Sequence, residues 1–289
     1  MEIPTHCRSY QPGYAIAPVT VHAYVINLAE AAARRAHIVA QLSNAEVDYE
    51  LVAGIDGNEL DLADPRVVDP ALRGQSWFQP GVAGCALSHL KVYRQILADG
   101  LDGALVLEDD IVIPAELNQV VAAVASQLAG AEVVLLNFDS DEPCRVTRQD
   151  SAQIGASHSL AVPLDVDQPR STAAYLITRE ACERMCQTVL PVRVQADEWG
   201  FFCRQGALDR LRCVLPLTVH KSPAFGSSVH HPPASLKARV NRTLGQRNVP
   251  VLTRAVVARR ARLQRHRTLV DFVDLPASGS ASQDQRSTP

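Results

Sequence analysis

Three consecutive carboxylates, Glu108, Asp109 and Asp110, directly follow the apolar run Ala104–Leu107. Adjacent carboxylates repel one another, so a folded chain tolerates them best where a cation or a strong donor neutralises them. Carboxylate oxygens are the ligands that Mg²⁺ and Mn²⁺ prefer, and these ions usually complete their shell with phosphate oxygens. The cluster indicates either a nucleotide diphosphate held through a metal ion or a solvated acidic turn, and its position leaves both open.

A second acidic pair, Asp197 and Glu198, precedes Trp199 and follows a turn at Pro191. A carboxylate beside an aromatic ring can accept a proton as a general base while the ring stacks on a sugar. Alternatively, Asp197 is the N-cap of a helix that starts near Glu198, a role worth about 1 kcal/mol.

Alternating apolar and amphipathic segments predict an α/β fold whose mainly parallel sheet is covered by helices on both faces. The predicted strands are Val21–Leu28, Tyr49–Ala53, Ala104–Leu107, Val133–Phe138 and Thr172–Thr178. The predicted helices are 29–43, Gly84–Ala98, 117–128 and Arg179–Leu190. Ligands of such sheets bind beyond the carboxyl ends of the strands, which is where Glu108–Asp110 lie.

Four segments then occur in a fixed order: VINLAEAAARR (Val25–Arg35), AGIDG (Ala53–Gly57), GVAGCALSHLKVYRQIL (Gly81–Leu97) and LVLEDDIVI (Leu105–Ile113). They are followed by TAAYLITREACERM (Thr172–Met185) and ADEW (Ala196–Trp199). Together these segments resemble the family-25 glycosyltransferases, over roughly residues 21–229. Bacterial members of that family build lipooligosaccharide and lipopolysaccharide, and animal relatives glycosylate collagen.

The resemblance implies a GT-A-like fold that binds a UDP-sugar, most often UDP-galactose, and inverts the anomeric centre with Mn²⁺ or Mg²⁺ and a carboxylate base. Glu108–Asp110 match the family's DXD-like metal position. We expect Asp110 to be the direct ligand, with Glu108 and Asp109 contacting the metal or the ribose. The resemblance also favours Asp197, ahead of Glu198, as the base that accepts the proton of a glycan or glycolipid acceptor.

Other polar residues of these segments are expected around the donor. Ser88 and His89 lie on one predicted helix, where His89 orients the donor or a loop unless it is an ordinary structural histidine. The remaining expected contacts are Asn27, Arg34 and Arg35 to the nucleotide, Asp56 to uridine, and His220 to the metal or diphosphate. A solvated helix face is the alternative for one of the two arginines.

The net charge of −3 conceals a strong asymmetry. Residues 1–233 carry a balance of −11, residues 234–267 carry ten basic residues and no acidic one, and the last 22 residues carry −2. We predict an N-terminal extension (1–20), a GT-A-like domain (21–233), a basic helical tail (234–275) and a disordered C-terminus (276–289). Residues 237–267 are expected to bind an anionic membrane surface or to dock onto the acidic body, and nucleic acid is the weakest of the three partners.

Further exclusions follow from composition. The chain has no run of about 18 apolar residues, and its first 18 residues do not resemble a secretory signal. Seven cysteines without such a signal indicate reduced thiols and a cytoplasmic protein, peripheral on the inner face of the membrane. Cys182 and Cys186 are expected to be buried, and no zinc site is predicted. The alternative to an enzyme is an inactive sugar-nucleotide-binding or scaffold protein of the same fold.

Overall fold

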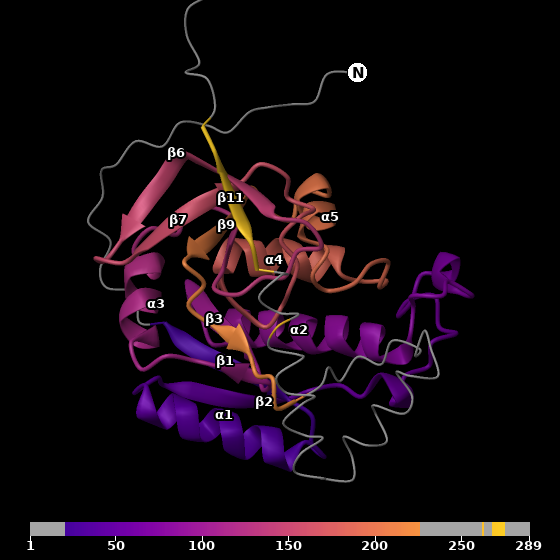
Figure 1. The fold of residues 1–289 in the computed structure, drawn as a ribbon. Coiled ribbons are helices and arrows are strands. Elements are labelled where there is room, and N and C mark those ends of the chain that lie inside the picture. Colours follow the sequence, from indigo (N-terminus) through magenta and orange to yellow (C-terminus); the bar gives the residue numbers. More distant parts are fainter. Residues whose placement is uncertain (1–20, 226–261, 263–267, 275–289) are drawn as a thin grey trace, which may run out of the picture.

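The computed structural model describes residues 21–225, 262 and 268–274. Nine strands form one sheet in the order β11-β6-β7-β9-β5-β8-β3-β1-β2 (Figure 1). In chain order they are β1 (His22–Asn27), β2 (Tyr49–Ala53), β3 (Gly103–Glu108), β5 (Glu132–Leu135), β6 (Cys144–Ile154), β7 (His158–Pro163), β8 (Ala174–Thr178), β9 (Arg210–Leu215) and β11 (Val270–Val273). Two short strands, β4 (Ile111–Val112) and β10 (His220–Lys221), pair separately and antiparallel.

The sheet is mainly parallel, as predicted. The pairings give seven of its nine described strands one direction, and β7 and β8 run the other way. β1 lies between β2 and β3, with Asn27 opposite Ala53 and Ile26 opposite Glu108. Asn27 and Glu108 therefore reach the same edge of the sheet, at the carboxyl ends of their strands.

Helices cover both faces of the sheet. They are α1 (Ala32–Asn44), α2 (Pro80–Ala98), α3 (Leu117–Ala125), α4 (Arg179–Thr188) and the short α5 (Trp199–Arg204). One buried cluster joins α2, α4 and α5, and a second joins α1 and α3. Neighbouring strand residues divide between them, since successive side chains of a strand point to opposite faces: Val106 packs in the first cluster, Leu105 and Leu107 in the second.

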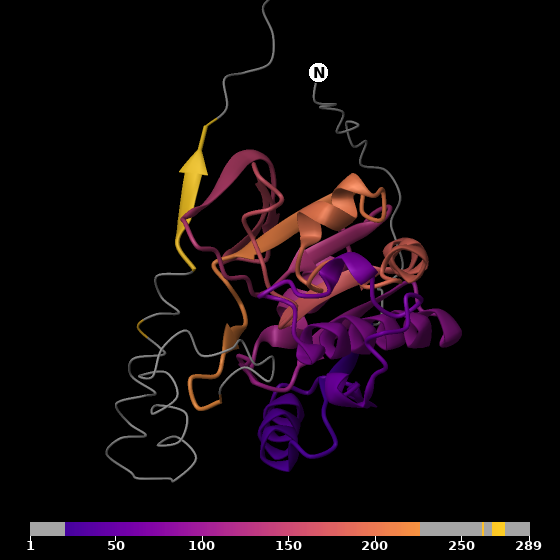
Figure 2. The same ribbon diagram turned by 90° about the vertical axis from the view of Figure 1, so that its right-hand side faces the viewer.

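Part of the predicted helical tail is a strand of the sheet. The predicted helical tail, 234–275, includes β11, a strand that pairs in parallel with β6 at the outer edge of the sheet (Figure 2). An edge strand such as β6 offers unpaired backbone groups that a later segment can satisfy. The sheet therefore includes residues beyond 233, while 1–20, 234–261 and 276–289 lie outside the described residues.

The other predicted elements are present and differ from the prediction mainly at their ends, while some observed strands were not predicted. α2 begins at Pro80, four residues before the predicted start, because proline suits the first turn of a helix. β6, β7 and β9 were missed: β6 is a mostly polar strand of 11 residues, its hairpin partner β7 (HSLAVP) has only six residues, and β9 (RLRCVL) carries two arginines.

The turn after β2 is clamped against α2. A Cβ added to Gly84 would lie 2.6 Å from both Ile55 O and Gly57 N, so only glycine allows this approach. Ser88 Oγ donates to Gly84 O at 2.7 Å and accepts from Ile55 N at 2.8 Å. α2 thereby fixes the position of the turn at Ile55–Gly57.

Gly84→Ala is expected to destabilise the protein by about 1–3 kcal/mol, because the added methyl group meets backbone that must shift. Urea denaturation measures the change. Gly54→Ala is the control, since its nearest neighbour is the flexible end of Leu28 at 3.1 Å. Equal stability of the two variants would contradict the proposed clamp.

Candidate active site

Two cavities open at the carboxyl edge of the sheet. The strand-end cavity, about 580 Å³, lies between β1, the turn after β2, α1 and α2. The acidic cavity, about 730 Å³, is lined by residues of the segments 139–142, 165–172 and 195–197 together with Lys221. Cys85 and Glu108 line both cavities and so form a shared wall.

Asp109 lines the strand-end cavity and is held by two side chains: Arg34, which lines the same cavity, and the buried Asn27, which lines neither cavity. Its Oδ2 accepts from Asn27 Nδ2 at 2.6 Å and its Oδ1 from Arg34 Nη1 at 2.9 Å. Asn27 ends β1 and Arg34 lies in the first turn of α1, so the site joins two elements of one β-α unit. Asp109 therefore positions Asn27 and Arg34, and its own oxygens are occupied.

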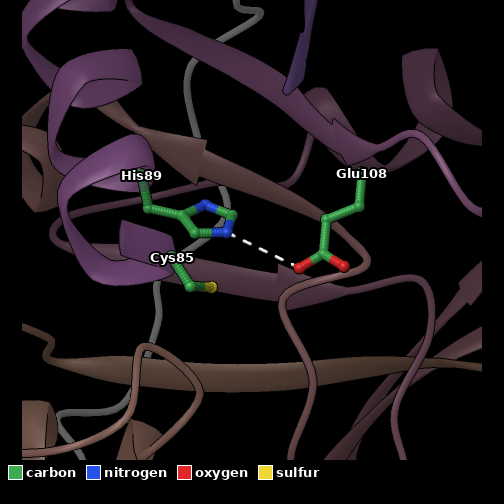
Figure 3. A group of neighbouring side chains, drawn as sticks. All are labelled: Cys85, His89 and Glu108. Carbon is green, nitrogen blue, oxygen red and sulfur yellow. Dashed lines mark ion pairs between the residues drawn. The ribbon is translucent and has the colours of Figure 1, made fainter. Parts of the chain in front are cut away.

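Glu108 faces the shared wall. Its Oε1 accepts from Thr172 Oγ1 at 2.6 Å and lies 3.7 Å from His89 Nε2 (Figure 3). Burial acts to raise the pKa of Glu108, but the contacts with His89 and Thr172 and the charge of Lys221 outweigh it, and the pKa is lowered. His89 is buried, with Nδ1 2.8 Å from Tyr175 Oη. His89 thus positions Glu108.

Asp110 is the least satisfied of the three carboxylates. Its Oδ2 lies 3.3 Å from Arg34 Nη2, whereas its Oδ1 is buried and has no hydrogen-bond partner in the described part of the chain. Burial first, and then the charge of Glu108, raise the pKa of Asp110 to about 6. A buried carboxylate oxygen without a partner, beside Glu108, fits a hard divalent cation such as Mg²⁺ or Mn²⁺. Glu108 and Asp110 are the residues that would hold it.

Asp197 and Glu198 have different surroundings. Asp197 lines the acidic cavity, and burial raises its pKa. Glu198 is ion-paired with Arg170 and is itself the N-cap of α5, without a side-chain cap bond. The alternative that Asp197 caps the helix is therefore wrong. The expected sugar-stacking role of Trp199 is also wrong, since Trp199 is 1% exposed and its Nε1 donates to Ser171 O at 3.2 Å.

The other predicted residues divide between cavity and surface. Asp56 lines the strand-end cavity and accepts from Asn58 N at 2.9 Å, and Ser88 lines it while holding the turn. Arg35 and His220 line neither cavity. His220 is exposed on β10, so the structure does not bring it to the carboxylates as expected.

Lys221, the neighbour of His220, was missed by sequence analysis. It lines the acidic cavity, and its Nζ donates to Asp139 Oδ2 at 2.6 Å. Two residues of a strand point to opposite sides, so the choice between His220 and Lys221 needed the strand and its orientation. β10 has only two residues and offers no periodicity from which to predict it.

Comparison with known proteins identifies the class. The family model described as glycosyltransferase family 25 (LPS biosynthesis protein) matches residues 20–199. The match covers more than half of the chain, and the chain belongs to glycosyltransferase family 25.

Individual relatives are distant. The lacto-N-neotetraose biosynthesis glycosyltransferase LgtE of Neisseria meningitidis is 26% identical over 62% of this chain and 65% of its own. Procollagen galactosyltransferase 2 of Homo sapiens is 22% identical over 56% of this chain and 26% of its own. The inactive glycosyltransferase 25 family member 3 of Mus musculus is 31% identical over 30% of this chain and 16% of its own. This chain thus spans just under two thirds of the first relative and about a quarter of the second. A solved glycosyltransferase involved in the glycosylation of the major capsid of PBCV-1 is 9% identical, with a TM-score of 0.31, over 67% of this chain and 80% of that one.

Asp110→Asn and Asp109→Asn are expected to affect different properties, metal binding and stability. Asp110→Asn weakens Mn²⁺ binding more than about tenfold but changes stability little, because Oδ1 has no partner among the described residues and the loss of the ion pair with Arg34 is offset by relief of the repulsion from Glu108. Asp109→Asn costs about 1–3 kcal/mol of stability through its contacts with Asn27 and Arg34. Mn²⁺ titration calorimetry in the presence of UDP and chemical denaturation measure the two quantities. An Mn²⁺ affinity equal to wild type in Asp110→Asn would remove this residue from the metal site.

Proposed function

We propose that this protein transfers a hexosyl group from a UDP-sugar to a glycan acceptor of the lipooligosaccharide or lipopolysaccharide type. Galactose is the proposed sugar. The observation that carries the proposal is the meeting of two cavities at Glu108. One cavity sits at the strand ends where nucleotides bind in α/β sheets, and the other holds a carboxylate suited to a base. A GT-A-like arrangement of donor and acceptor is part of the same proposal.

The strand-end cavity is the proposed donor site. Arg34 offers a guanidinium suited to phosphate, and Asp109 holds it in place. The turn at Ile55–Gly57, fixed by Ser88, brings Asp56 to the same cavity, where it is proposed to contact uridine. Glu108 and Asp110 would hold Mg²⁺ or Mn²⁺, which supplies positive charge to the leaving diphosphate.

The acidic cavity is the proposed acceptor site. Asp197 accepts the proton of an acceptor hydroxyl as its oxygen bonds to the anomeric carbon. The bond from that carbon to the diphosphate oxygen breaks, and its electron pair leaves with UDP, which inverts the centre. A raised pKa brings Asp197 closer to the range in which a general base is most effective, whereas the ion pair with Arg170 makes Glu198 less suited to the role.

The names of the relatives support the choice of substrates. The family model is described by LPS biosynthesis, one relative acts in lacto-N-neotetraose biosynthesis and another is a procollagen galactosyltransferase. Galactose is the sugar that the third name specifies, and a lipid-linked glycan is the acceptor that fits the first two.

An inactive protein of the same fold is the second candidate, because one relative is named inactive. Glu108, Asp110 and Asp197 line the cavities here, which favours activity. Incubation with a panel of UDP-sugars and Mn²⁺, with and without chelator, separates the two. Binding of UDP-sugars without transfer or hydrolysis of any would establish the inactive candidate.

Asp197→Asn is expected to reduce sugar transfer by about 10²–10⁴-fold with little change in UDP-sugar affinity, because a base is lost while the donor cavity is intact. Product mass measures transfer and calorimetry measures binding. Asp209→Asn is the matched control, an exposed aspartate that pairs with Arg184 and lines neither cavity. Transfer near the wild-type rate in Asp197→Asn would assign the base elsewhere.

Membrane association is proposed for the basic segment 237–267, at the cytoplasmic face of the membrane where a lipid-linked acceptor lies. In the described part of the chain, no helix combines the length and apolar character needed to span a bilayer. The segment carries ten basic residues and no acidic one, and each Lys or Arg near an anionic surface contributes roughly 1 kcal/mol.

Replacing the six arginines of 251–267 by glutamine is expected to abolish flotation with anionic vesicles and to leave β11 intact. These arginines are Arg254, Arg259, Arg260, Arg262, Arg265 and Arg267. Substitution is preferable to truncation because Val270–Val273 pair with β6. Zwitterionic vesicles are the control, and equal flotation of variant and wild type would contradict membrane binding by this segment.

A further inference from the structure

A thiol, an imidazole and a carboxylate meet on the wall that the two cavities share. Cys85 and His89 are four residues apart and lie on one face of α2, and Glu108 ends β3 (Figure 3). One ligand atom from each residue lies within 4.8 Å of the others. Cys85 and Glu108 also line both cavities, so the cluster is accessible to small ions.

The imidazole is oriented as in metal sites. Its Nδ1 lies 2.8 Å from Tyr175 Oη, which lies 3.0 Å from Tyr93 Oη. Histidine ligands usually bind metal through one ring nitrogen while the other donates to a neighbouring group that fixes the ring. Nε2 lies 3.7 Å from Glu108 Oε1, beyond a direct hydrogen bond. When a cation replaces any proton on Nε2, Nδ1–H donates to Tyr175 and the lone pair of Nε2 is free to bind the ion.

The ligand set selects a soft cation. Thiolate and imidazole favour Zn²⁺ and its chemical relatives over Mg²⁺ and Mn²⁺, which prefer oxygen. One thiolate and one carboxylate balance the two charges of the ion, and the thiol proton is released to solvent on binding. Three protein ligands with a fourth position open are the pattern of accessible zinc sites.

We propose that Cys85, His89 and Glu108 form a site for a soft divalent cation of the Zn²⁺ class, whose fourth position opens to the two cavities. The site shares Glu108 with the proposed Mg²⁺ or Mn²⁺ site, so the two kinds of ion compete for this carboxylate. Metal binding by the cluster does not depend on the proposed transferase activity. The spacing of Cys182 and Cys186 alone predicts no zinc site; the signal in the sequence is the four-residue spacing of Cys85 and His89 on one helix.

Cobalt absorption tests the site in the full-length protein. Co²⁺ is expected to produce a thiolate-to-cobalt charge-transfer band in the wild type that Zn²⁺ abolishes. Cys85→Ser is expected to lose the band, and His89→Gln to weaken Zn²⁺ affinity more than about tenfold. Cys203→Ser, a half-buried cysteine of α5 outside the cluster, is the matched control and keeps the band. Absence of the band in the wild type, or its persistence in Cys85→Ser, overturns the proposal.

A second measurement needs no variant and stays informative if Cys85→Ser does not fold. The wild type is alkylated with iodoacetamide, with and without Zn²⁺, and the modified cysteines are mapped by mass spectrometry. Zn²⁺ is expected to protect Cys85 selectively, compared with the half-buried Cys186 and Cys203. Equal alkylation of Cys85 in both conditions refutes the site, whatever the outcome of the transfer assays.

Discussion

Like-charge repulsion at the end of β3 is the constraint on which the site depends. Glu108, Asp109 and Asp110 are adjacent and largely removed from water, and the fold neutralises each differently. Thr172 and His89 contact Glu108, while Asn27 and Arg34 hold Asp109. Asp110 shares Arg34, and one of its oxygens has no hydrogen-bond partner among the residues that the structure describes. Residues of α1, α2, β1 and the segment that precedes β8 each supply part of this compensation.

The same arrangement places the carboxylates in two separate cavities. Asp109 holds Arg34 in the strand-end cavity. Asp197 and Lys221 line the acidic cavity, on the other side of Glu108. A displacement reaction needs an incoming and a leaving group on opposite sides of one carbon. In the proposed reaction that carbon lies beside Glu108 and Cys85, which line both cavities, and the proposed soft-cation site competes for the same Glu108.

The elements with strong periodicity could be predicted from the sequence. β2 and the start of α4 were predicted to the residue, and β1, β3, α1 and α3 within a few residues, because apolar strands and amphipathic helices are local patterns. β9 was missed because its two arginines conceal a buried strand: Arg212 is 5% exposed and pairs with Glu132 of the neighbouring β5. That pair joins residues 80 positions apart, which no local pattern reveals.

The sequence by itself determined the family, through the order of its motifs. It also placed the carboxylate cluster at the end of a strand, because both the cluster and the strand depend on residue types close in the chain. Only the tertiary structure decided which side chains meet. It buried Trp199 in the core, placed Lys221 instead of His220 in the acidic cavity, and returned Val270–Val273 to the sheet. The reason is physical: local spacing sets the direction of a side chain on its own element, whereas the partners that neutralise or bury it come from segments distant in sequence.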